Sequence, residues 1–221
     1  MSTILVIGAG GGTAATTTAV GLGDACARDG RTAVVADATV GGGDLAERAG
    51  DRGIPVVDRP ATETAEPDYE RLDWYLRHRT DVVLYDLGHR ALGRERARPL
   101  RSEPSASIVL TVCARPDAVA RTRSALRTIS FDIGERALRR TQVVLSHLVP
   151  GSKGFDFAEL EDAVFGRVAG VHEIAFDPHL GDGDTIAAAQ LAPSTAAVYR
   201  RILDTRIHRA SGTLSSGTMS A

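Results

Sequence analysis

The sequence is poor in cysteine, in lysine and in long apolar runs, and each scarcity narrows the class of protein. Its two cysteines, Cys26 and Cys113, lie in apolar segments without the spacing of a metal site or a disulfide framework, so we expect buried thiols in a reducing compartment. No segment approaches the roughly 18 apolar residues that a membrane-spanning helix needs. The short apolar run near the N-terminus has no basic leader, unlike a signal peptide. We therefore expect a cytoplasmic protein.

Lysine is almost absent, since Lys153 is the only one among 26 basic residues. The 28 acidic residues give a formal net charge of −2, which does not indicate a general nucleic-acid-binding protein, although a local basic patch could still meet nucleic acid. Four arginines are close enough in sequence to form such a patch or a solvated surface: Arg94, Arg96, Arg98 and Arg101. We expect Lys153 to lie in a turn, where it is either a plain surface residue or a contact to a ligand.

Apolar strands alternate with helical segments along the 221 residues, a length typical of one α/β domain. Strands are predicted at residues 4–7, 31–37, 53–58, 81–86, 107–113, 141–145 and 172–176, with 53–58 at an edge because of Pro55. Helices are predicted at 14–29, 44–49, 68–79, 116–129, 156–165 and 193–207, and a surface helix with a loop at 89–104.

Most of these strands are apolar without alternation, which is typical of a parallel sheet covered on both faces. We therefore predict a three-layer α/β fold in which a mostly parallel, twisted sheet lies between two layers of helices. The single domain spans residues 1–209, and the small, polar tail at 210–221 is predicted to be disordered.

A glycine-rich loop joins the first predicted strand to the first predicted helix. Glycines occupy positions 8, 10, 11 and 12, and the helix begins at about residue 14. Such a loop presents backbone N–H groups beside the positive end of a helix, an arrangement that suits a phosphate. The alternative is a tight strand-to-helix turn without a ligand.

The loop lacks the lysine of a Walker-type phosphate loop, which reaches the β- and γ-phosphates. Ala14, Ala15 and Thr16 stand where that motif has Gly-Lys-Ser/Thr. Thr16 still offers a hydroxyl to a magnesium ion, and Asp37 and Asp86 end two strands at the same edge of the sheet, where they could hold the ion's water shell. Alternatively, these acids only cap the turns that follow them.

Together, the loop and the two acids resemble the ParA/MinD family of deviant Walker ATPases, which are SIMIBI-class P-loop proteins. Residues 10–19 lie in register with the family loop Lys-Gly-Gly-x-Gly-Lys-Thr-Thr-x-Ala, and residues 35–39, 81–87, 109–120 and 143–151 are similar to later family segments. Residues 174–180 and 191–199 resemble actinobacterial members. The resemblance covers residues 3–209 and implies two sets of site residues. It implies nucleotide binding by Gly10, Gly11, Gly12, Thr13, Ala14, Ala15, Thr16 and Thr17, and magnesium binding by Thr16, Asp37 and Asp86.

The departures from the family pattern indicate a degenerate member. Gly10 and Ala15 replace the two family lysines, and Ala14 replaces the last glycine of the loop. Thr39 stands where the family has the acid that positions the attacking water, and Ser146 where an asparagine is expected at the base site. Losing such charge stabilisation typically costs powers of ten in rate. The resemblance therefore implies a pseudo-ATPase that binds ATP or ADP with magnesium weakly, or binds neither.

Three hypotheses of function follow. The first is a scaffold or regulatory partner in a positioning, partitioning or secretion system, acting through a protein partner or as a homodimer, without the amphipathic tail that anchors MinD to membranes. The second is a slow nucleotide-switched ATPase in which hydroxyls and arginines compensate for the lysines. The third is a Rossmann-type dinucleotide-binding protein, because residues 10–15 fit Gly-x-Gly-x-x-Ala and Asp37 follows at a suitable distance.

Overall fold

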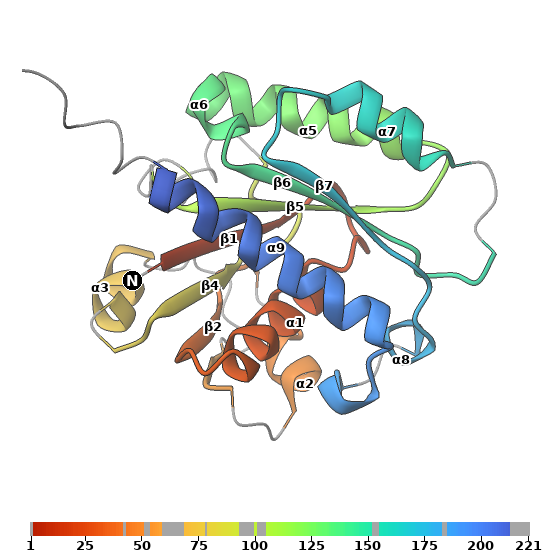
Figure 1. Ribbon diagram of the computed structural model, residues 1–221. Helices are drawn as coiled ribbons and strands as arrows, with labels where there is room; N and C mark the ends of the chain where they lie inside the picture. Colours follow the sequence, from red (N-terminus) through yellow and green to blue (C-terminus); the bar gives the residue numbers. More distant parts are fainter. Residues whose placement is uncertain are drawn as a thin grey trace, which may run out of the picture.

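The computed structural model describes residues 2–41, 43–50, 54–58, 69–77, 79–92, 100, 105–151, 155–182 and 185–212. Its centre is a parallel sheet of seven strands in the order β3-β2-β4-β1-β5-β6-β7 (Figure 1). The strands are β1 (Ser2–Gly8), β2 (Ala33–Asp37), β3 (Val56–Val57), β4 (Val82–Asp86), β5 (Ser107–Cys113), β6 (Thr141–Ser146) and β7 (Gly170–Ile174). The predicted α/β fold with a parallel sheet is confirmed.

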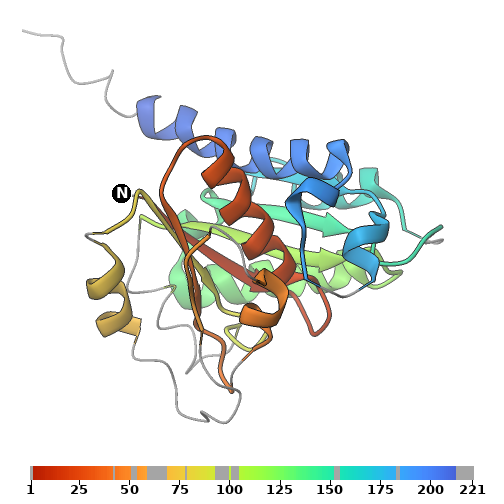
Figure 2. The same cartoon turned by 90° about the horizontal axis from the view of Figure 1, so that it is seen from below.

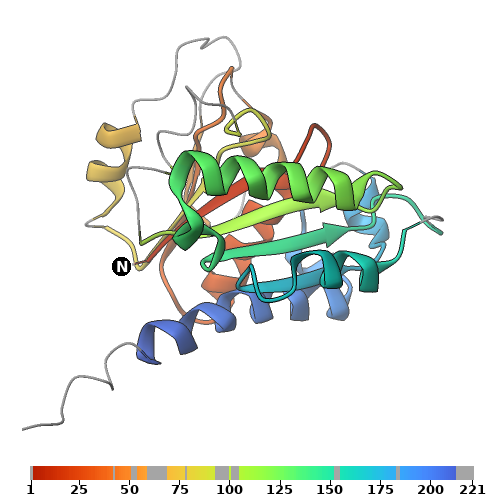
Figure 3. The ribbon, with the colours of Figure 1, turned by 90° about the horizontal axis from the view of Figure 1, so that it is seen from above.

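Helices cover both faces of the sheet and enclose two apolar cores. The first face carries α3 (Tyr69–Arg77), α5 (Ala118–Ile133), α6 (Glu135–Leu138) and α7 (Phe157–Val164), of which α5 and α7 lie over β5 and β6 in Figure 3. The second face carries α1 (Ala15–Arg28), α2 (Leu45–Ala49), α8 (Pro178–Gly181), a 3₁₀ turn (Ala188–Gln190) and α9 (Pro193–Gly212). Successive β1 residues point to opposite cores, Leu5 to the first and Val6 to the second. The strands are apolar throughout because both of their faces are buried.

Close packing on the second face fixes the position of α1. Helices α1 and α9 lie side by side on that face (Figure 2). A Cβ on Gly21 would lie 2.5 Å from Cζ of Tyr199, and a Cβ on Gly23 would lie 2.7 Å from Cγ2 of Val35. Glycine is therefore required at both positions, although it weakens a helix interior. This packing holds α1 against β2 and α9.

The strand order brings the glycine loop to the crevice where ligands bind in such sheets. β1 lies between β4 and β5, so the loop that follows it emerges where the chain turns to opposite sides of the sheet. The order also counts against the dinucleotide hypothesis. In a Rossmann fold the first two strands are neighbours, whereas here β4 lies between β1 and β2.

Several details differ from the sequence-based predictions. Helical spacing alone would group Tyr75 with the buried Tyr69 and Leu76, but its side chain is 48% exposed and the Arg79 guanidinium lies over its ring at 4.2 Å. Asp73 takes the inner place and accepts a hydrogen bond from the Tyr85 hydroxyl at 3.0 Å, because residues four apart share a helix face.

Other differences concern where elements begin and end. β7 begins at Gly170 rather than at residue 172, and α9 was predicted to end at residue 207 but continues to Gly212. The rest of the predicted tail, most of residues 93–104 with their four arginines, and Lys153 lie outside the described residues. No helix in the described part of the chain is long and apolar enough to cross a membrane.

Candidate functional site

The loop between β1 and α1 has a backbone conformation that is rare outside glycine. Gly12 and Ala14 adopt left-handed conformations with φ of 67° and 63°, and Ala14 is the one non-glycine residue with positive φ in the described ranges. An L-residue in this conformation costs roughly 1–2 kcal/mol. Strain of this kind is typical of a ligand-binding turn.

Hydrogen bonds from threonine hold the loop against β5. The Thr13 hydroxyl donates to the Gly10 carbonyl at 3.0 Å and lies 3.1 Å from the Thr111 hydroxyl. The Ala9 amide donates to the Thr111 carbonyl at 2.9 Å. A Cβ on Gly8 would lie 2.5 Å from the Thr13 hydroxyl oxygen, so this position requires glycine. The loop is thus fixed by the protein's own contacts.

The N-terminus of α1 is open. Ala14, the N-cap residue, offers no side-chain hydrogen bond, and the first turn contains no acidic residue. The first N–H groups of a helix have no partner within the helix. The loop therefore presents unsatisfied donors and the positive helix end to one cavity, which favours an anion.

Asp37 and Asp86 lie side by side at the carboxyl edge of the sheet. They are register partners on β2 and β4, and both are fully buried. Oδ1 of Asp37 accepts hydrogen bonds from the amide of Thr39 at 2.8 Å and from its hydroxyl at 2.6 Å, and Oδ1 of Asp86 accepts one from the Gly88 amide at 3.0 Å. Neither Oδ2 has a donor at bonding geometry, although the Thr16 hydroxyl lies close to Asp86.

These buried carboxylates favour a bound cation. Burial raises the pKa of Asp86 to about 6 from its usual 3.8, against the lowering effects of the Thr16 hydroxyl and the Gly88 amide, and Asp37 and Asp44 raise it further. Two unsatisfied carboxylate oxygens beside a hydroxyl fit magnesium, which prefers oxygen ligands and keeps several waters. The described residues contain no cluster of three or more His, Cys, Asp or Glu side chains suited to a metal ion. Thr16, water and ligand oxygens would therefore complete the shell.

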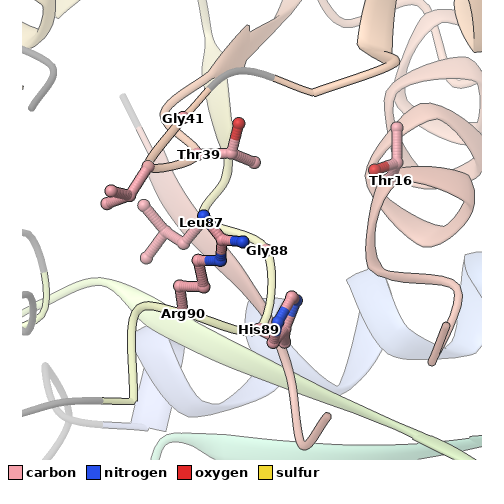
Figure 4. A pocket seen from close by; sticks show the side chains of 8 residues that line it. Thr16, Thr39, Gly41, Leu87, Gly88, His89 and Arg90 are labelled. Carbon is pink, nitrogen blue, oxygen red and sulfur yellow. The ribbon is translucent and has the colours of Figure 1, made fainter. Parts of the chain in front are cut away.

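Two adjoining cavities lie at this edge of the sheet. The larger has a volume of about 260 Å³ and the smaller about 200 Å³. Both are bounded by Thr16, Gly88 and His89. Figure 4 shows the larger cavity, with His89 and Arg90 opposite Thr16. The two cavities form one cleft along the carboxyl edge of the sheet.

The structure brings together most of the residues predicted to bind nucleotide. The smaller cavity is lined by all but one of them: Gly10, Gly12, Thr13, Ala14, Ala15, Thr16 and Thr17. Gly11 is the exception, and a Cβ on it would lie 3.9 Å from Cε1 of His89. Their role in binding stays a prediction. Ser146 ends β6 and is buried, and its role at a base site also stays a prediction.

Four further residues of the cleft belong to no sequence motif: Asp44, Arg48, His89 and Arg90. Asp44 directly precedes α2, Arg48 lies in the last turn of this short helix, and the two form an ion pair at 3.1 Å. His89 and Arg90 follow Asp86 closely in the chain, and this position after a strand-ending acid was the only signal for them.

Several solved structures share this fold. A ParA family ATPase from Chlorobium tepidum TLS gives a TM-score of 0.69 at 15% identity, covering 94% of this chain and 98% of that one. The septum site-determining protein MinD complexed with Mg-ADP, from Pyrococcus horikoshii OT3, gives 0.67 at 16% identity, covering 98% and 100%. A plasmid partition protein from Borrelia burgdorferi B31 bound to AMPPNP gives 0.61 at 12% identity, covering 94% and 98%. This chain has the fold of the ParA and MinD ATPases.

Sequence comparison gives no further assignment. No protein-family model and no curated protein matches the chain. The function must therefore be argued from the cleft itself.

Proposed function

We propose that this chain is a degenerate ParA/MinD-type protein that binds a magnesium nucleotide in the cleft and acts as a scaffold or regulatory partner without significant hydrolysis. The observation that carries the proposal is the pairing of an uncapped, left-handed loop with two buried carboxylates whose second oxygens lack donors. The loop suits phosphate and the carboxylates suit the cation that accompanies phosphate in a nucleotide. Solved structures with this fold hold Mg-ADP and AMPPNP.

The cleft has few of the groups that accelerate phosphoryl transfer. Ala15 is buried at the start of α1 and cannot supply the charge that a loop lysine would direct at the phosphates. The Thr39 hydroxyl already donates to Asp37 and has no carboxylate with which to orient water. Since such groups each typically contribute several kcal/mol to the barrier, we expect hydrolysis slower by powers of ten than with both in place.

A role through protein contacts agrees with what is known of the fold. A MinC:MinD cell division protein complex from Aquifex aeolicus has a subunit of this fold, at a TM-score of 0.61 and 17% identity. By analogy, the nucleotide state of this chain would set its affinity for a protein partner or a second copy. The cellular process we propose is positioning, partitioning or secretion.

Calorimetry and an ATPase assay test the proposal together. Full-length protein should bind Mg-ATP or Mg-ADP saturably, and Asp86→Ala should weaken that binding when magnesium is present. Turnover should remain near the background of a matched preparation. Absence of binding would overturn the nucleotide site, and turnover that Asp86→Ala abolishes would overturn the loss of hydrolysis.

A slow, nucleotide-switched ATPase is the second candidate, because guanidinium groups approach the cleft. Arg90 lines the larger cavity, and Arg48, which pairs with Asp44, lines the smaller one, so two guanidinium groups border the cleft without a loop lysine. Light scattering separates the candidates. A switch would give an ATP-dependent increase in molecular mass that decays as ATP is hydrolysed, whereas a pseudo-ATPase would hold one state while ATP lasts.

A further inference from the structure

The loop after β4 places an arginine at the far wall of the larger cavity. His89 and Arg90 line this cavity opposite Thr16 (Figure 4). Nη1 of Arg90 lies 3.3 Å from the place that a Cβ on Gly41 would occupy. Gly41 has a φ of 91°, so glycine both permits this turn and leaves room for the guanidinium. The Arg90 side chain thus lies at the cleft beside the loop that follows β2.

Arg90 differs from the other two arginines near the glycine loop, because it pairs with no acid among the residues that the structure describes. Arg48 pairs with Asp44, and Arg121, whose Nη1 lies above Gly10, pairs with Asp117. Arg90 forms no ion pair with any residue that the structure describes. Its planar fork remains available for two parallel hydrogen bonds to an oxyanion.

Charges of both signs lie around the larger cavity. The buried carboxylates of Asp37 and Asp86 accept hydrogen bonds from Thr39 and Gly88, which line this cavity, and Arg90 lines it as well. The carboxylates would repel a phosphate that arrived without a cation, and Arg90 would repel a cation that arrived without an anion. A phosphate that carries magnesium is attracted by both.

We propose that Arg90, assisted by His89, binds the terminal phosphate of a magnesium nucleoside triphosphate and thereby distinguishes it from a diphosphate. This rests on the proposed function. The loop amides and the N-terminus of α1 face the smaller cavity, which would take the inner phosphates. The larger cavity is lined by Thr16 on one side and by Arg90 on the other, so the terminal phosphate of the nucleotide would enter it.

Calorimetric titration of the full chain with Mg-ATP and with Mg-ADP tests this inference. We compare wild type with Arg90→Gln, Arg90→Lys and the control Arg123→Gln, which removes an exposed arginine of α5 outside the cleft. Loss of a charge-assisted hydrogen bond lowers affinity by about 10- to 100-fold. Arg90→Gln should therefore weaken Mg-ATP by that factor and Mg-ADP by less than about 3-fold, since the diphosphate does not reach Arg90. Arg90→Lys should recover part of the loss, because it keeps the charge without the fork.

Each outcome decides one of the two proposals. Wild type that binds neither nucleotide overturns the nucleotide site and this inference with it. Wild type that binds both, with an unchanged ratio of the two affinities in Arg90→Gln, overturns the inference alone and leaves the nucleotide site standing. The inference would also be overturned if Arg123→Gln lost Mg-ATP affinity as strongly as Arg90→Gln. Thermal unfolding midpoints within about 2 °C of wild type show that the variants are folded, since that shift corresponds to no more than about 1 kcal/mol for a chain of this size.

Discussion

At the scale of single residues, Ala14 carries a cost that the fold does not require. Its left-handed backbone suits glycine, yet the side chain gains nothing visible in return at the uncapped helix end. Replacing Ala14 with glycine removes the steric penalty of the left-handed conformation, which stabilises the fold. The replacement also raises the conformational entropy of the unfolded chain, which destabilises the fold, but the steric effect is the larger.

Ala14→Gly should therefore raise the free energy of unfolding by up to about 1 kcal/mol. Ala19→Gly is the matched control, because the same chemical change within α1 should lower the free energy by about 1 kcal/mol or more. Urea denaturation of both variants measures the difference. A destabilised Ala14→Gly would show that the alanine methyl stabilises the loop.

The residues of the cleft could be predicted from the sequence only in part. The glycine loop, Asp37 and Asp86 each end a buried strand, so the parallel sheet alone brings them to one edge. Arg90 could not be predicted, because its approach to Gly41 depends on how two loops pack across the sheet edge. That Arg90 forms no ion pair within the described part of the chain is likewise a property of tertiary structure.

Asp86 gives a second residue-scale prediction. Its pKa in the folded chain, about 6, lies above the usual 3.8, so the folded state binds more protons than the unfolded state between these values. The ionised carboxylate therefore destabilises the fold above pH 6 when magnesium is absent. Asp86→Asn should raise the free energy of unfolding at pH 7.5 by about 2 kcal/mol in EDTA, and the gain should vanish near pH 4.

In the presence of magnesium nucleotide, the wild type should become more stable than Asp86→Asn. The ion binds the folded wild type and compensates the buried charge, whereas the asparagine variant lacks the carboxylate that attracts it. Unfolding in EDTA and in saturating Mg-ATP measures both effects. If wild type were the more stable protein in EDTA, the buried carboxylate would be satisfied by the chain itself and the argument for a cation would fail.

At the scale of helices and strands, the contact of α1 with α9 decides where the loop lies. Gly21 lies under the Tyr199 ring, and no ordinary side chain fits between them. Gly21→Ala should therefore lower the free energy of unfolding by about 1–3 kcal/mol, although alanine favours a helix interior by about 1 kcal/mol. Denaturation of the variant measures the loss.

A double-mutant cycle provides the control for this contact. Tyr199→Ala alone should cost about 3–5 kcal/mol, because it leaves a cavity. In that background Gly21→Ala should be neutral or stabilising, since the ring no longer opposes the methyl group. Additive effects of the two changes would show that Gly21 is constrained by something other than Tyr199.

The strands were easier to predict from the sequence than the short helices, for a physical reason. The range 107–113 was predicted as a strand and is β5, because a continuous apolar run reflects burial on two faces. The helices α6 and α8 have four residues each, too few for a hydrophobic period, and neither was predicted. α8 begins instead at a tertiary contact, where buried Asp177 accepts hydrogen bonds from His179 and Ala192 amides at 3.1 and 2.9 Å.

At the scale of the whole molecule, a hydrogen-bonded chain joins the far edge of the sheet to α9. Nε2 of His172 on β7 lies 2.8 Å from Oε1 of Gln142 on β6, whose Nε2 donates to the Ile202 carbonyl at 3.0 Å. Burial, and then the charge of Arg201, lower the pKa of His172 to about 4 from its usual 6.5. The unfolded state therefore binds more protons between pH 4 and 6.5, and stability present above 6.5 is lost as the pH falls through this range.

The pH dependence of the whole chain should then be a balance between two distant groups. On acidification from pH 7 to 4, protonation of Asp86 should raise the free energy of unfolding by about 2 kcal/mol. Over the same range, His172 should lower it by about 2 kcal/mol, after allowing for the partial exposure of this histidine. His172→Gln keeps an amide donor toward Gln142 but does not titrate, so in EDTA this variant should become more stable on acidification relative to wild type. Asp86→Asn should lose more stability than wild type over the same range.

The control His147→Gln, which removes a histidine paired with Glu173 at 2.8 Å, should follow the wild-type profile more closely than His172→Gln does. Parallel profiles for wild type and both test variants would mean that neither buried group is linked to folding, because linkage requires the slopes to differ.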